Sequence, residues 1–305
     1  MNKISKVADL LKKHAEARGQ QIAFSGPGQA VTYADLAVRT GRIAVNLQSA
    51  GATRGCRVAI VLGGCIEAVE SIFATTRASA VGVPLDPRSS QAELAKVLER
   101  SCADVIITDS QRLSRVCAAI SSLAGETERR RTIVVVDRES NDLKSRVNVI
   151  VPDQGFVVRW YEDWAAGSNS EHPAEEPFDD LGLDEPAWLH YTTGTTGEPK
   201  GVLSSQRAWM WTAVASYIPS LELTSADKLF WPLPLFHAFG HSLCIIGTLA
   251  VGATTHLVGD EPQLASLRQN PETTIIAGAP ASFRELVTAT TTDVTAREAL
   301  SQNIT

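Results

Sequence analysis

The most informative part of this sequence is the segment Tyr191-Thr192-Thr193-Gly194-Thr195-Thr196-Gly197-Glu198-Pro199-Lys200-Gly201. It places four threonines, three glycines and one lysine within eleven residues. Glycines allow backbone N–H groups to turn toward an anion, and hydroxyl groups add further donors. Lys200 supplies a compact positive charge of the kind that a polyphosphate needs. The segment therefore predicts a phosphate-binding loop.

Two features distinguish this loop from other glycine-rich loops. Glycine and threonine are also common in flexible surface hairpins, which is the alternative interpretation. However, the loop directly follows an apolar strand pattern at residues 187–191, as phosphate loops commonly do. It is also not a Walker A loop, because Lys200 lies between Pro199 and Gly201 and lacks the Gly-Lys-Ser/Thr ending.

Strand and helix patterns alternate on both sides of the loop. Apolar, β-branched runs predict strands at 57–62, 81–85, 105–108 and 132–137, and helical spacing predicts helices at 66–78, 91–100 and 113–123. Strand and helix patterns alternate again at 188–191, 208–218, 228–231, 243–250, 254–258 and 274–277. Such alternation predicts an α/β fold of βαβ units with largely parallel sheets.

The length of 305 residues favours two stacked subdomains over one core. We expect a first α/β subdomain at 1–161 and a second at 187–305 that carries the phosphate loop. Between them, residues 162–186 hold nine acidic residues, three prolines and no Lys or Arg. This segment is most simply an exposed acidic linker, although a run of one sign could also bind cations or a basic partner.

Composition excludes several classes of protein. Hydrophobic residues make up 44% and charged residues 20% of the chain, as in ordinary globular proteins. The net charge of -6 argues against binding to a nucleic-acid backbone. The five cysteines are scattered and form no C-x-x-C pair, so the sequence predicts neither a disulfide framework nor a zinc site, and a reducing cytoplasm fits best.

The sequence predicts no membrane-spanning segment. At the N-terminus, Ile4, Val7, Leu10 and Leu11 follow helical spacing instead of forming the apolar core of a signal peptide. The longest apolar stretch, at 243–253, is interrupted by glycine and threonine and is shorter than the ~20 residues that cross a bilayer.

Segment 191–201 closely resembles the signature phosphate loop of the AMP-forming adenylating superfamily of acyl-CoA synthetases, luciferases and nonribosomal adenylation domains. Segments 31–36, 55–60 and 77–87 are similar to earlier elements of the same family, although Ser79 replaces the usual glycine. These three segments support the fold and carry no chemistry. The resemblance implies the α/β architecture of the N-terminal domain of AMP-forming acyl-CoA synthetases, present here incompletely.

A second motif, Trp231-Pro232-Leu233-Pro234-Leu235-Phe236-His237-Ala238-Phe239-Gly240-His241, resembles the family segment beside the acyl pocket. In members that activate amino acids, an aspartate follows the phenylalanine and pairs with the substrate ammonium. His237 occupies that position here, and an unpaired ammonium in a dry pocket would cost several kcal/mol. The motif is more similar to fatty-acyl or aryl CoA synthetases and acyl-carrier ligases, which makes Phe236, His237 and Phe239 the expected pocket residues.

The two histidines, His237 and His241, also allow other interpretations. His237 and His241 are four residues apart, as in H-E-x-x-H zinc sites, but Ala238 replaces the glutamate and a third ligand is not apparent. A buried, hydrogen-bonded histidine would be the default without the resemblance. With it, His237 is expected to be a catalytic residue that helps to place the substrate carboxylate, and no metal site is predicted.

The resemblance implies two half-reactions. A carboxylate would attack the α-phosphorus of ATP, whose phosphates carry Mg²⁺, and the thiol of CoA or of an acyl carrier protein's phosphopantetheine would then take the acyl group. The groups implied to hold the ATP phosphates are those of the loop, namely Thr192, Thr193, Gly194, Thr195, Thr196, Gly197 and Lys200.

The family's later motifs, Tyr-Gly-x-Thr-Glu and Thr-Gly-Asp, and its C-terminal domain with the catalytic lysine are not found in the sequence. We therefore expect these 305 residues to be the front part of a ligase and to be inactive alone. Two alternatives stay open. One is a non-catalytic remnant or interaction module with the same fold, and the other is a loading adenylation domain excised from a polyketide or nonribosomal peptide assembly line.

Overall fold

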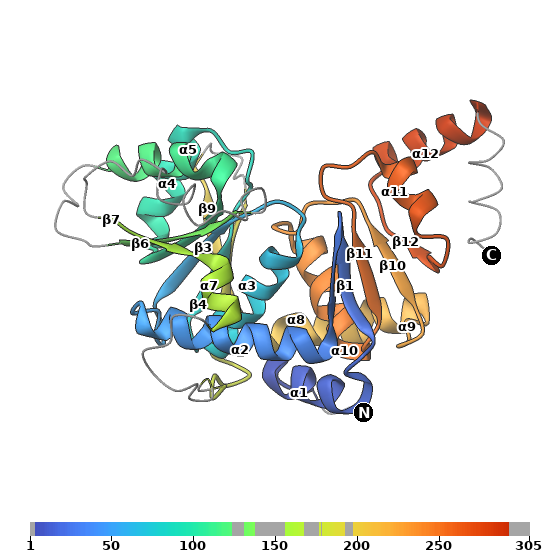
Figure 1. Ribbon diagram of the computed structural model, residues 1–305, viewed down its shortest axis with the longest axis horizontal. Coiled ribbons are helices and arrows are strands. Elements are labelled where there is room, and N and C mark those ends of the chain that lie inside the picture. The colour runs from blue at the N-terminus through green and yellow to red at the C-terminus, as the bar shows by residue number, and fades with distance from the viewer. Residues whose placement is uncertain are drawn as a thin grey trace. The chain divides into compact units, whose positions relative to one another are not determined.

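The computed structural model describes residues 4–123, 131–137, 156–167, 177, 179–192 and 198–292. The chain forms two compact units (Figure 1). Unit 1 contains Met1–Ala37, Gly63–Val69 and Arg207–Thr305, and unit 2 contains Val38–Leu62 and Glu70–Gln206. The boundaries expected at 161/162 and 186/187 both lie inside unit 2. The division differs because strand pairing between distant segments, and not chain order, decides which residues share a core.

Unit 2 is built on a seven-stranded sheet with the order β7-β6-β5-β3-β4-β8-β9. Every neighbouring pair is parallel except β8 and β9, which are antiparallel. The prediction of a largely parallel sheet is therefore confirmed here. The strands are β3 (Arg57–Val61), β4 (Val81–Pro84), β5 (Val105–Asp109), β6 (Arg131–Val136), β7 (Phe156–Trp160), β8 (Pro186–Thr192) and β9 (Lys200–Ser205).

The helices of unit 2 begin where the sequence supplies capping groups. Helix α4 (Gln91–Ser101) starts with a capping box in which Ser90 and Glu93 each accept a hydrogen bond from the other's backbone N–H. Helix α5 (Ser110–Ser121) starts at Asp109, which accepts from the backbone N–H of Arg112 at 2.9 Å. The patterns predicted as strands at 57–62, 81–85, 105–108 and 132–137 and as helices at 91–100 and 113–123 are confirmed to within three residues.

Unit 1 contains a five-stranded sheet with the order β12-β10-β11-β1-β2. β1 is parallel to β11, and β10 is parallel to both β11 and β12, whereas β1 and β2 are antiparallel. The second sheet is thus also largely parallel, as predicted. Its strands are β1 (Ile22–Gly26), β2 (Gln29–Thr32), β10 (Lys228–Trp231), β11 (Thr254–Leu257) and β12 (Ile275–Ile276).

The N-terminal segment belongs to the sheet of unit 1 although more than 190 residues separate it from the partner strands. Helix α1 (Val7–Arg18) buries Val7, Leu10 and Leu11, which confirms the helical spacing of the sequence. His14 contacts the carbonyl oxygen of Leu249 through Nε2 at 2.7 Å. Helix α8 (Gln206–Thr212) begins at the last residue of unit 2 and continues in unit 1. Unit 1 also contains α9 (Ile218–Leu221), α10 (Thr248–Val251), α11 (Gln263–Gln269), α12 (Pro280–Thr292) and the π-helices η1 (Ala213–Tyr217) and η2 (Gly240–Gly247).

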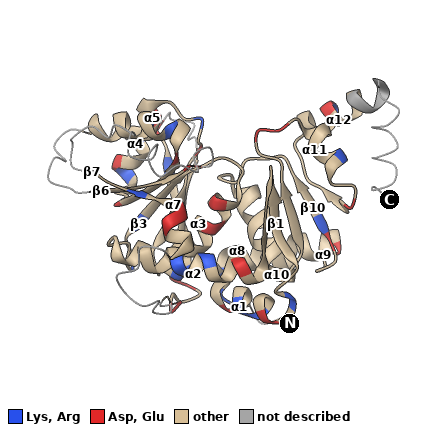
Figure 2. Ribbon diagram, viewed as in Figure 1, with Lys and Arg blue, Asp and Glu red and all other residues tan. Residues whose placement is uncertain are grey.

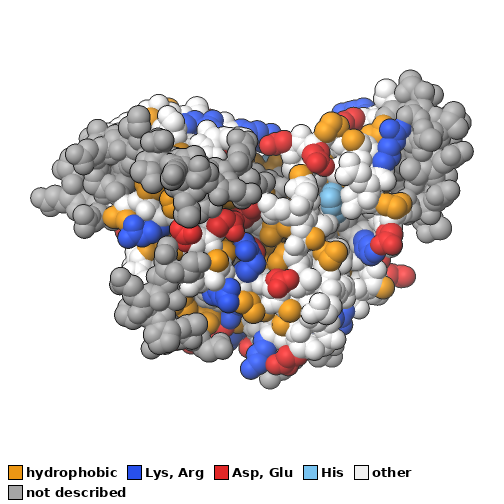
Figure 3. Space-filling model, in the orientation of Figure 1, with side chains coloured by type: hydrophobic (Ala, Val, Ile, Leu, Met, Phe, Trp, Pro, Cys, Tyr) orange, Lys and Arg blue, Asp and Glu red, His pale blue; other side chains and the backbone are white. Residues whose placement is uncertain are grey.

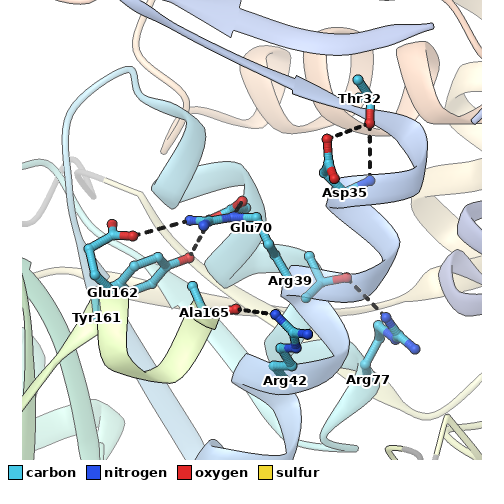
Figure 4. A network of polar contacts seen from close by, with 10 residues as sticks. Thr32, Asp35, Arg39, Arg42, Glu70, Arg77, Tyr161, Glu162 and Ala165 are labelled. Atoms are coloured by element: carbon cyan, nitrogen blue, oxygen red, sulfur yellow. Dashed lines mark hydrogen bonds and ion pairs between the residues drawn. The ribbon is translucent and has the colours of Figure 1, made fainter. Parts of the chain in front are cut away.

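The start of the acidic segment is packed into unit 2. Helix α7 (Tyr161–Ala166) buries the side chains of Tyr161 and Trp164. The hydroxyl of Tyr161 donates to Glu70 at 3.0 Å, and Arg39 donates to both carboxylate oxygens of Glu70 at 2.5 and 3.1 Å (Figure 4). Arg39 also lies 3.7 Å from the carboxylate of Glu162. Arg39 lies on α2 (Tyr33–Ser49), Glu70 on α3 (Ile66–Arg77) and Glu162 on α7. Figure 2 shows Lys and Arg in blue on α2 and Asp and Glu in red on α3 and α7.

The end of the acidic segment is held by two arginines of the same unit. Arg77 donates from Nε and Nη2 to Asp179 at 2.9 Å, and Arg54 contacts both Asp180, at 2.8 Å, and Glu185. A hydrogen bond from Ser79 and the guanidinium of Arg54 lower the pKa of Asp180. The described part of 162–186 therefore differs from the exposed linker expected from its composition. The acidic side chains named above pair with arginines of unit 2 itself.

Within the described ranges, every helix is too short or too polar to span a bilayer. On the face drawn in Figure 3, Lys and Arg side chains are interspersed with Asp and Glu side chains.

Strand β8 is joined to the sheet of unit 2 by a close contact between Trp188 and Gly82. The two residues are register partners, and a Cβ atom built on Gly82 would lie 3.0 Å from Cδ1 of the fully buried Trp188. We expect Gly82→Ala to lower the free energy of unfolding by about 1–2 kcal/mol, because the buried indole must shift. Urea denaturation measures this, with Gly63→Ala as the control because open space surrounds that glycine. Equal stability of both variants would contradict the packing argument.

Candidate functional site

The predicted phosphate segment connects the ends of β8 and β9. β8 is parallel to β4, so the segment leaves the sheet of unit 2 at its carboxyl edge, where α/β sheets commonly bind ligands. Thr192 and Lys200 are register partners in the hairpin, and the hydroxyl of Thr192 donates to the carbonyl oxygen of Lys200 at 3.5 Å. The structure therefore brings Thr192 and Lys200 together. Thr193, Gly194, Thr195, Thr196 and Gly197 lie outside the described residues.

This position corrects one expectation from the sequence. The loop was expected to belong to the subdomain formed by 187–305, but β8 and β9 extend the sheet formed by β3 to β7. The reason is the packing of the apolar β8 against β4, which the local strand pattern cannot specify. Leu189 lies in the same core cluster as Val81 and Val83 of β4.

Lys200 lies at the exposed start of β9, as a residue that faces an anion must. Next to it, a Cβ atom on Gly201 would lie 2.9 Å from Cδ1 of Leu189 and 3.4 Å from the ring of Tyr191. Glycine at 201 thus permits β9 to approach β8 closely. Burial raises the pKa of Tyr191, although the positive charges of Arg57 and Arg100 oppose this shift.

Phe236, His237 and Phe239 follow β10 in unit 1. The imidazole of His237 is exposed, and its ring centroid lies 4.9 Å from that of Phe236. The side chain of Phe239 is 38% exposed, and its ring contacts the fully buried Trp231 at 5.1 Å and Tyr217 at 5.8 Å between centroids. Phe239 therefore offers one aromatic surface to solvent while two other aromatic side chains support it.

Trp231 and Tyr217 are the neighbours that the sequence argument did not assign to this site. Trp231 stands in the quoted motif but precedes its recognisable part, and Tyr217 lies outside the motif, at the end of η1. The hydroxyl of Ser242, at the start of η2, lies 3.5 Å from that of Tyr217. No local signal connects Tyr217 with Phe239, and only the fold brings them together.

Two π-helical segments position the aromatic residues Tyr217 and Phe239. Tyr217 ends η1 and Phe239 directly precedes η2. π-Helical turns are rare and occur frequently at functional sites. The first position of η2 also requires glycine, since a Cβ atom on Gly240 would lie 2.6 Å from the carbonyl oxygen of Pro234. The absence of a side chain at Gly240 thus allows the start of η2 to pack closely against the backbone of Pro234 and Leu235.

His237 and His241 lie in different environments. The backbone N–H of His241 donates to the carbonyl oxygen of His237 at 2.9 Å, one turn apart. However, the imidazole of His241 is fully buried against Trp209, at 4.8 Å between ring centroids, whereas His237 is exposed. Among the residues that the structure describes, no group of three or more His, Cys, Asp or Glu side chains is arranged to hold a metal ion.

The segment after β12 lies at the same edge of unit 1 as the His237 segment. β10 and β12 are parallel neighbours, so residues 232–239 and 277–280 both follow the carboxyl end of a strand. The carboxyl edge of a parallel sheet is the usual position of a ligand site. Each unit thus has one candidate segment at the carboxyl edge of its own sheet. In unit 2 it is the hairpin of β8 and β9, called the phosphate hairpin after its predicted role, and in unit 1 it is the His237 segment, residues 232–239.

Comparison with known proteins supplies relatives at two levels of similarity. The chain is 45% identical over 295 residues to chalcone synthase cfoA of Aspergillus candidus and 44% identical over 292 residues to naringenin synthase of Pestalotiopsis fici. Each match covers 95% of this chain but 10% of the relative. Indoleacetate–CoA ligase of Aromatoleum aromaticum is 29% identical over 251 residues, which are 82% of this chain and 44% of that protein.

Solved structures share the fold at lower identity. The anthranilate CoA ligase AuaEII in complex with anthranoyl-AMP superimposes with a TM-score of 0.78 at 22% identity, over 94% of this chain and 52% of that one. A benzoate CoA ligase from Burkholderia xenovorans superimposes with a TM-score of 0.74 at 20% identity, over 93% of this chain and 52% of that one. The chain therefore has the fold of about half of these proteins, which confirms the architecture implied by the resemblance.

A family model described as "AMP-binding enzyme" matches residues 11–304, nearly the whole chain. The match includes the hairpin that carries Thr192 and Lys200 and the segment that carries His237. The resemblance inferred from the phosphate loop is thereby confirmed, and the chain belongs to the AMP-binding enzyme family.

Proposed function

We propose that this chain is the nucleotide-binding part of an ATP-dependent, AMP-forming ligase that activates a carboxylic acid as an acyl-adenylate. The observation that supports the proposal most strongly is the phosphate hairpin of an AMP-binding enzyme, in which Thr192 and Lys200 are paired. The names of the relatives add support, since they include indoleacetate–CoA and feruloyl-CoA enzymes. The chain covers less than half of each of these two, so the activity belongs to the intact protein that contains it.

In the first half-reaction, a carboxylate oxygen of the substrate attacks the α-phosphorus of ATP. The bond between the α-phosphorus and the bridging oxygen breaks, and pyrophosphate leaves with the electron pair. Lys200 and the hydroxyl of Thr192 would offset the charge that grows on the departing phosphates, together with Thr193, Thr195 and Thr196 and the loop amides. Mg²⁺ would arrive bound to the ATP phosphates.

In the second half-reaction, a thiol sulfur attacks the carbonyl carbon of the acyl-adenylate. The thiol loses its proton, the carbon–oxygen bond to AMP breaks, and a thioester forms. The acceptor would be CoA or the phosphopantetheine of a carrier protein. His237 is proposed to help place the substrate carboxylate, because it is exposed and lies beside Phe236 and Phe239 at the candidate acyl segment.

We propose an aromatic acid as the preferred substrate. Phe239 presents a partly exposed ring supported by Trp231 and Tyr217, and an aryl group stacks favourably on such a surface. Residues 232–241 contain no acidic residue that could pair with an α-ammonium group. The names of two similar proteins, indoleacetate–CoA ligase and feruloyl-CoA synthase, are in keeping with this class.

A panel of acids tests the proposal through ATP–pyrophosphate exchange by the intact protein. We expect each aryl or alkyl acid to exceed its 2-amino analogue by at least about tenfold in kcat/KM, because the ammonium would be desolvated without a partner. Aryl acids are expected to exceed alkyl acids of similar size. Faster exchange with the amino acids would refute the pocket assignment, and no exchange with any acid would refute the ligase.

A second candidate is a loading adenylation unit within a multidomain synthase. Its support is that the matches at 45 and 44% identity cover 10% of each relative, so these relatives consist mostly of other segments. In that case a carrier-protein thiol, and not free CoA, would accept the acyl group. Radiolabelled acid supplied with ATP would label the intact protein covalently without added CoA.

A further inference from the structure

Two basic side chains of helix α4 contact one acidic side chain of the phosphate hairpin. Arg100 donates from Nη1 to Oε2 of Glu198 at 2.8 Å, and Nζ of Lys96 lies 3.9 Å from Oε1 of the same carboxylate. Lys96 and Arg100 are four residues apart and therefore lie on one face of the helix. Glu198 precedes Lys200 by two residues. We call these three residues the α4–Glu198 cluster.

The same helix also supports β8 through its apolar face. Leu94, Val97 and Leu98 of α4 lie in one core cluster with Leu189 of β8, and Tyr191 packs against that cluster. The helix is thus fixed relative to the sheet, so it is a rigid support for Glu198. By contrast, the charged side chains are about half-exposed, at 49% for Arg100 and 57% for Glu198.

We propose that the α4–Glu198 cluster positions Lys200 for the phosphates of ATP. This inference rests on the proposed function. Pro199 separates Glu198 from Lys200, and its ring fixes φ, so the direction of the chain at Glu198 is transmitted to Lys200. On the other side, Lys200 is paired with Thr192 in the hairpin. Lys200 is therefore held from both directions, by the strand ladder and by the cluster.

Lys96, Arg100 and Glu198 act through Lys200 in this proposal, so they are positioning residues. A direct contact of Lys96 and Arg100 with ATP is the competing explanation. The two explanations differ for Glu198. If the cluster positions Lys200, removal of the carboxylate weakens ATP binding. If the cations bind ATP themselves, removal of the carboxylate frees them and leaves ATP binding equal or tighter.

The test compares Glu198→Gln, the pair Lys96→Gln with Arg100→Gln, and all three changes together in the intact protein. The KM for ATP in pyrophosphate exchange is expected to rise about two- to fivefold in each, because exposed ion pairs contribute little individually. The triple variant is expected to have the same KM for ATP as the other variants, since all of them lose the same contact. Exchanging the charges, with Glu198→Lys, Lys96→Glu and Arg100→Glu, is expected to restore most of the wild-type KM.

Two controls separate positioning from a general effect. Glu272→Gln, which breaks the exposed ion pair between Glu272 and Lys228 in unit 1, is expected to leave the KM for ATP unchanged. The KM for the acid is expected to stay at the wild-type value in every variant. An unchanged KM for ATP after Glu198→Gln, with an increase only after loss of Lys96 and Arg100, would overturn the proposal.

Hydrogen–deuterium exchange at the amides of Glu198, Lys200 and Gly201 provides a readout that does not depend on catalysis. Loss of the cluster is expected to accelerate exchange at these amides, and the charge-exchanged variant is expected to slow it again. Unchanged exchange in the Gln variants would overturn the positioning role. A wild-type protein without pyrophosphate exchange would instead refute the proposed ligase, while the amide exchange still decides whether the cluster restrains Lys200.

Discussion

Lys200→Ala is expected to lower the rate of ATP–pyrophosphate exchange about 30- to 900-fold in the intact protein. Loss of one charge-assisted contact to developing transition-state charge costs about 2–4 kcal/mol, and each 1.36 kcal/mol corresponds to a tenfold change in rate. Lys200 is exposed at the start of β9 and lies outside the hydrophobic core, so the fold is expected to persist. Exchange rates and circular dichroism of the purified variant check both statements.

Lys228→Ala is the matched control for Lys200→Ala. Lys228 also begins a strand, β10, and is partly exposed, but it forms an ion pair with Glu272 and lies in unit 1. We expect this variant to exchange pyrophosphate at nearly the wild-type rate. Near-normal exchange by a well-folded Lys200→Ala variant would remove Lys200 from the phosphate site.

Glu70→Ala is expected to lower the free energy of unfolding by about 3 kcal/mol. Removing one partner of a buried charge pair typically costs about 3–5 kcal/mol, because the remaining groups lose their compensation. The Glu70 side chain is fully buried and accepts hydrogen bonds from Arg39 and Tyr161. Arg39 is 29% exposed and can recover some hydration, which places the expected loss at the lower end of that range.

Urea denaturation followed by tryptophan fluorescence measures this loss, since Trp164 and Trp188 are buried in unit 2. Glu162→Ala is the control, because Glu162 contacts the same arginine but is 40% exposed. Glu162→Ala is expected to lower the free energy of unfolding by less than about 1 kcal/mol. Similar losses in both variants would show that burial of Glu70 does not determine the stability of this network.

Local sequence patterns predicted much of unit 2. The helix at 91–100 was predictable because apolar spacing and the capping residue Ser90 act within a few residues of one another. The strand at 105–108 was predictable because every side chain of β5 up to Thr108 is buried, which requires a continuous apolar run. By contrast, β1, β2, β7 and β9 were not predicted. β2, for example, buries only one of its four residues and depends on pairing with β1.

The phosphate hairpin was recognisable from sequence for the same reason. A phosphate loop needs glycines, hydroxyls and a lysine at fixed short spacings, so its signal is contained in contiguous residues. The aromatic neighbours of Phe239 had no such signal, because Tyr217 lies on a separate π-helix and makes its contact only in the folded chain. The contact of Lys96 and Arg100 with Glu198 was equally invisible, as about 100 residues separate them.

Local patterns in the sequence were sufficient to predict the types of most strands and helices, the largely parallel α/β class and the family, and they indicated a candidate phosphate-binding segment at 191–201. These depend on backbone conformation and on side-chain periodicity over short stretches, where each residue acts on its near neighbours. Three features became visible only in the folded chain: 4–37 joins the sheet of 228–276, β8 packs on Gly82 of β4, and the acidic segment binds Arg39, Arg54 and Arg77. Those outcomes depend on packing and desolvation between residues that are far apart in the chain, and many alternative pairings satisfy the same local pattern.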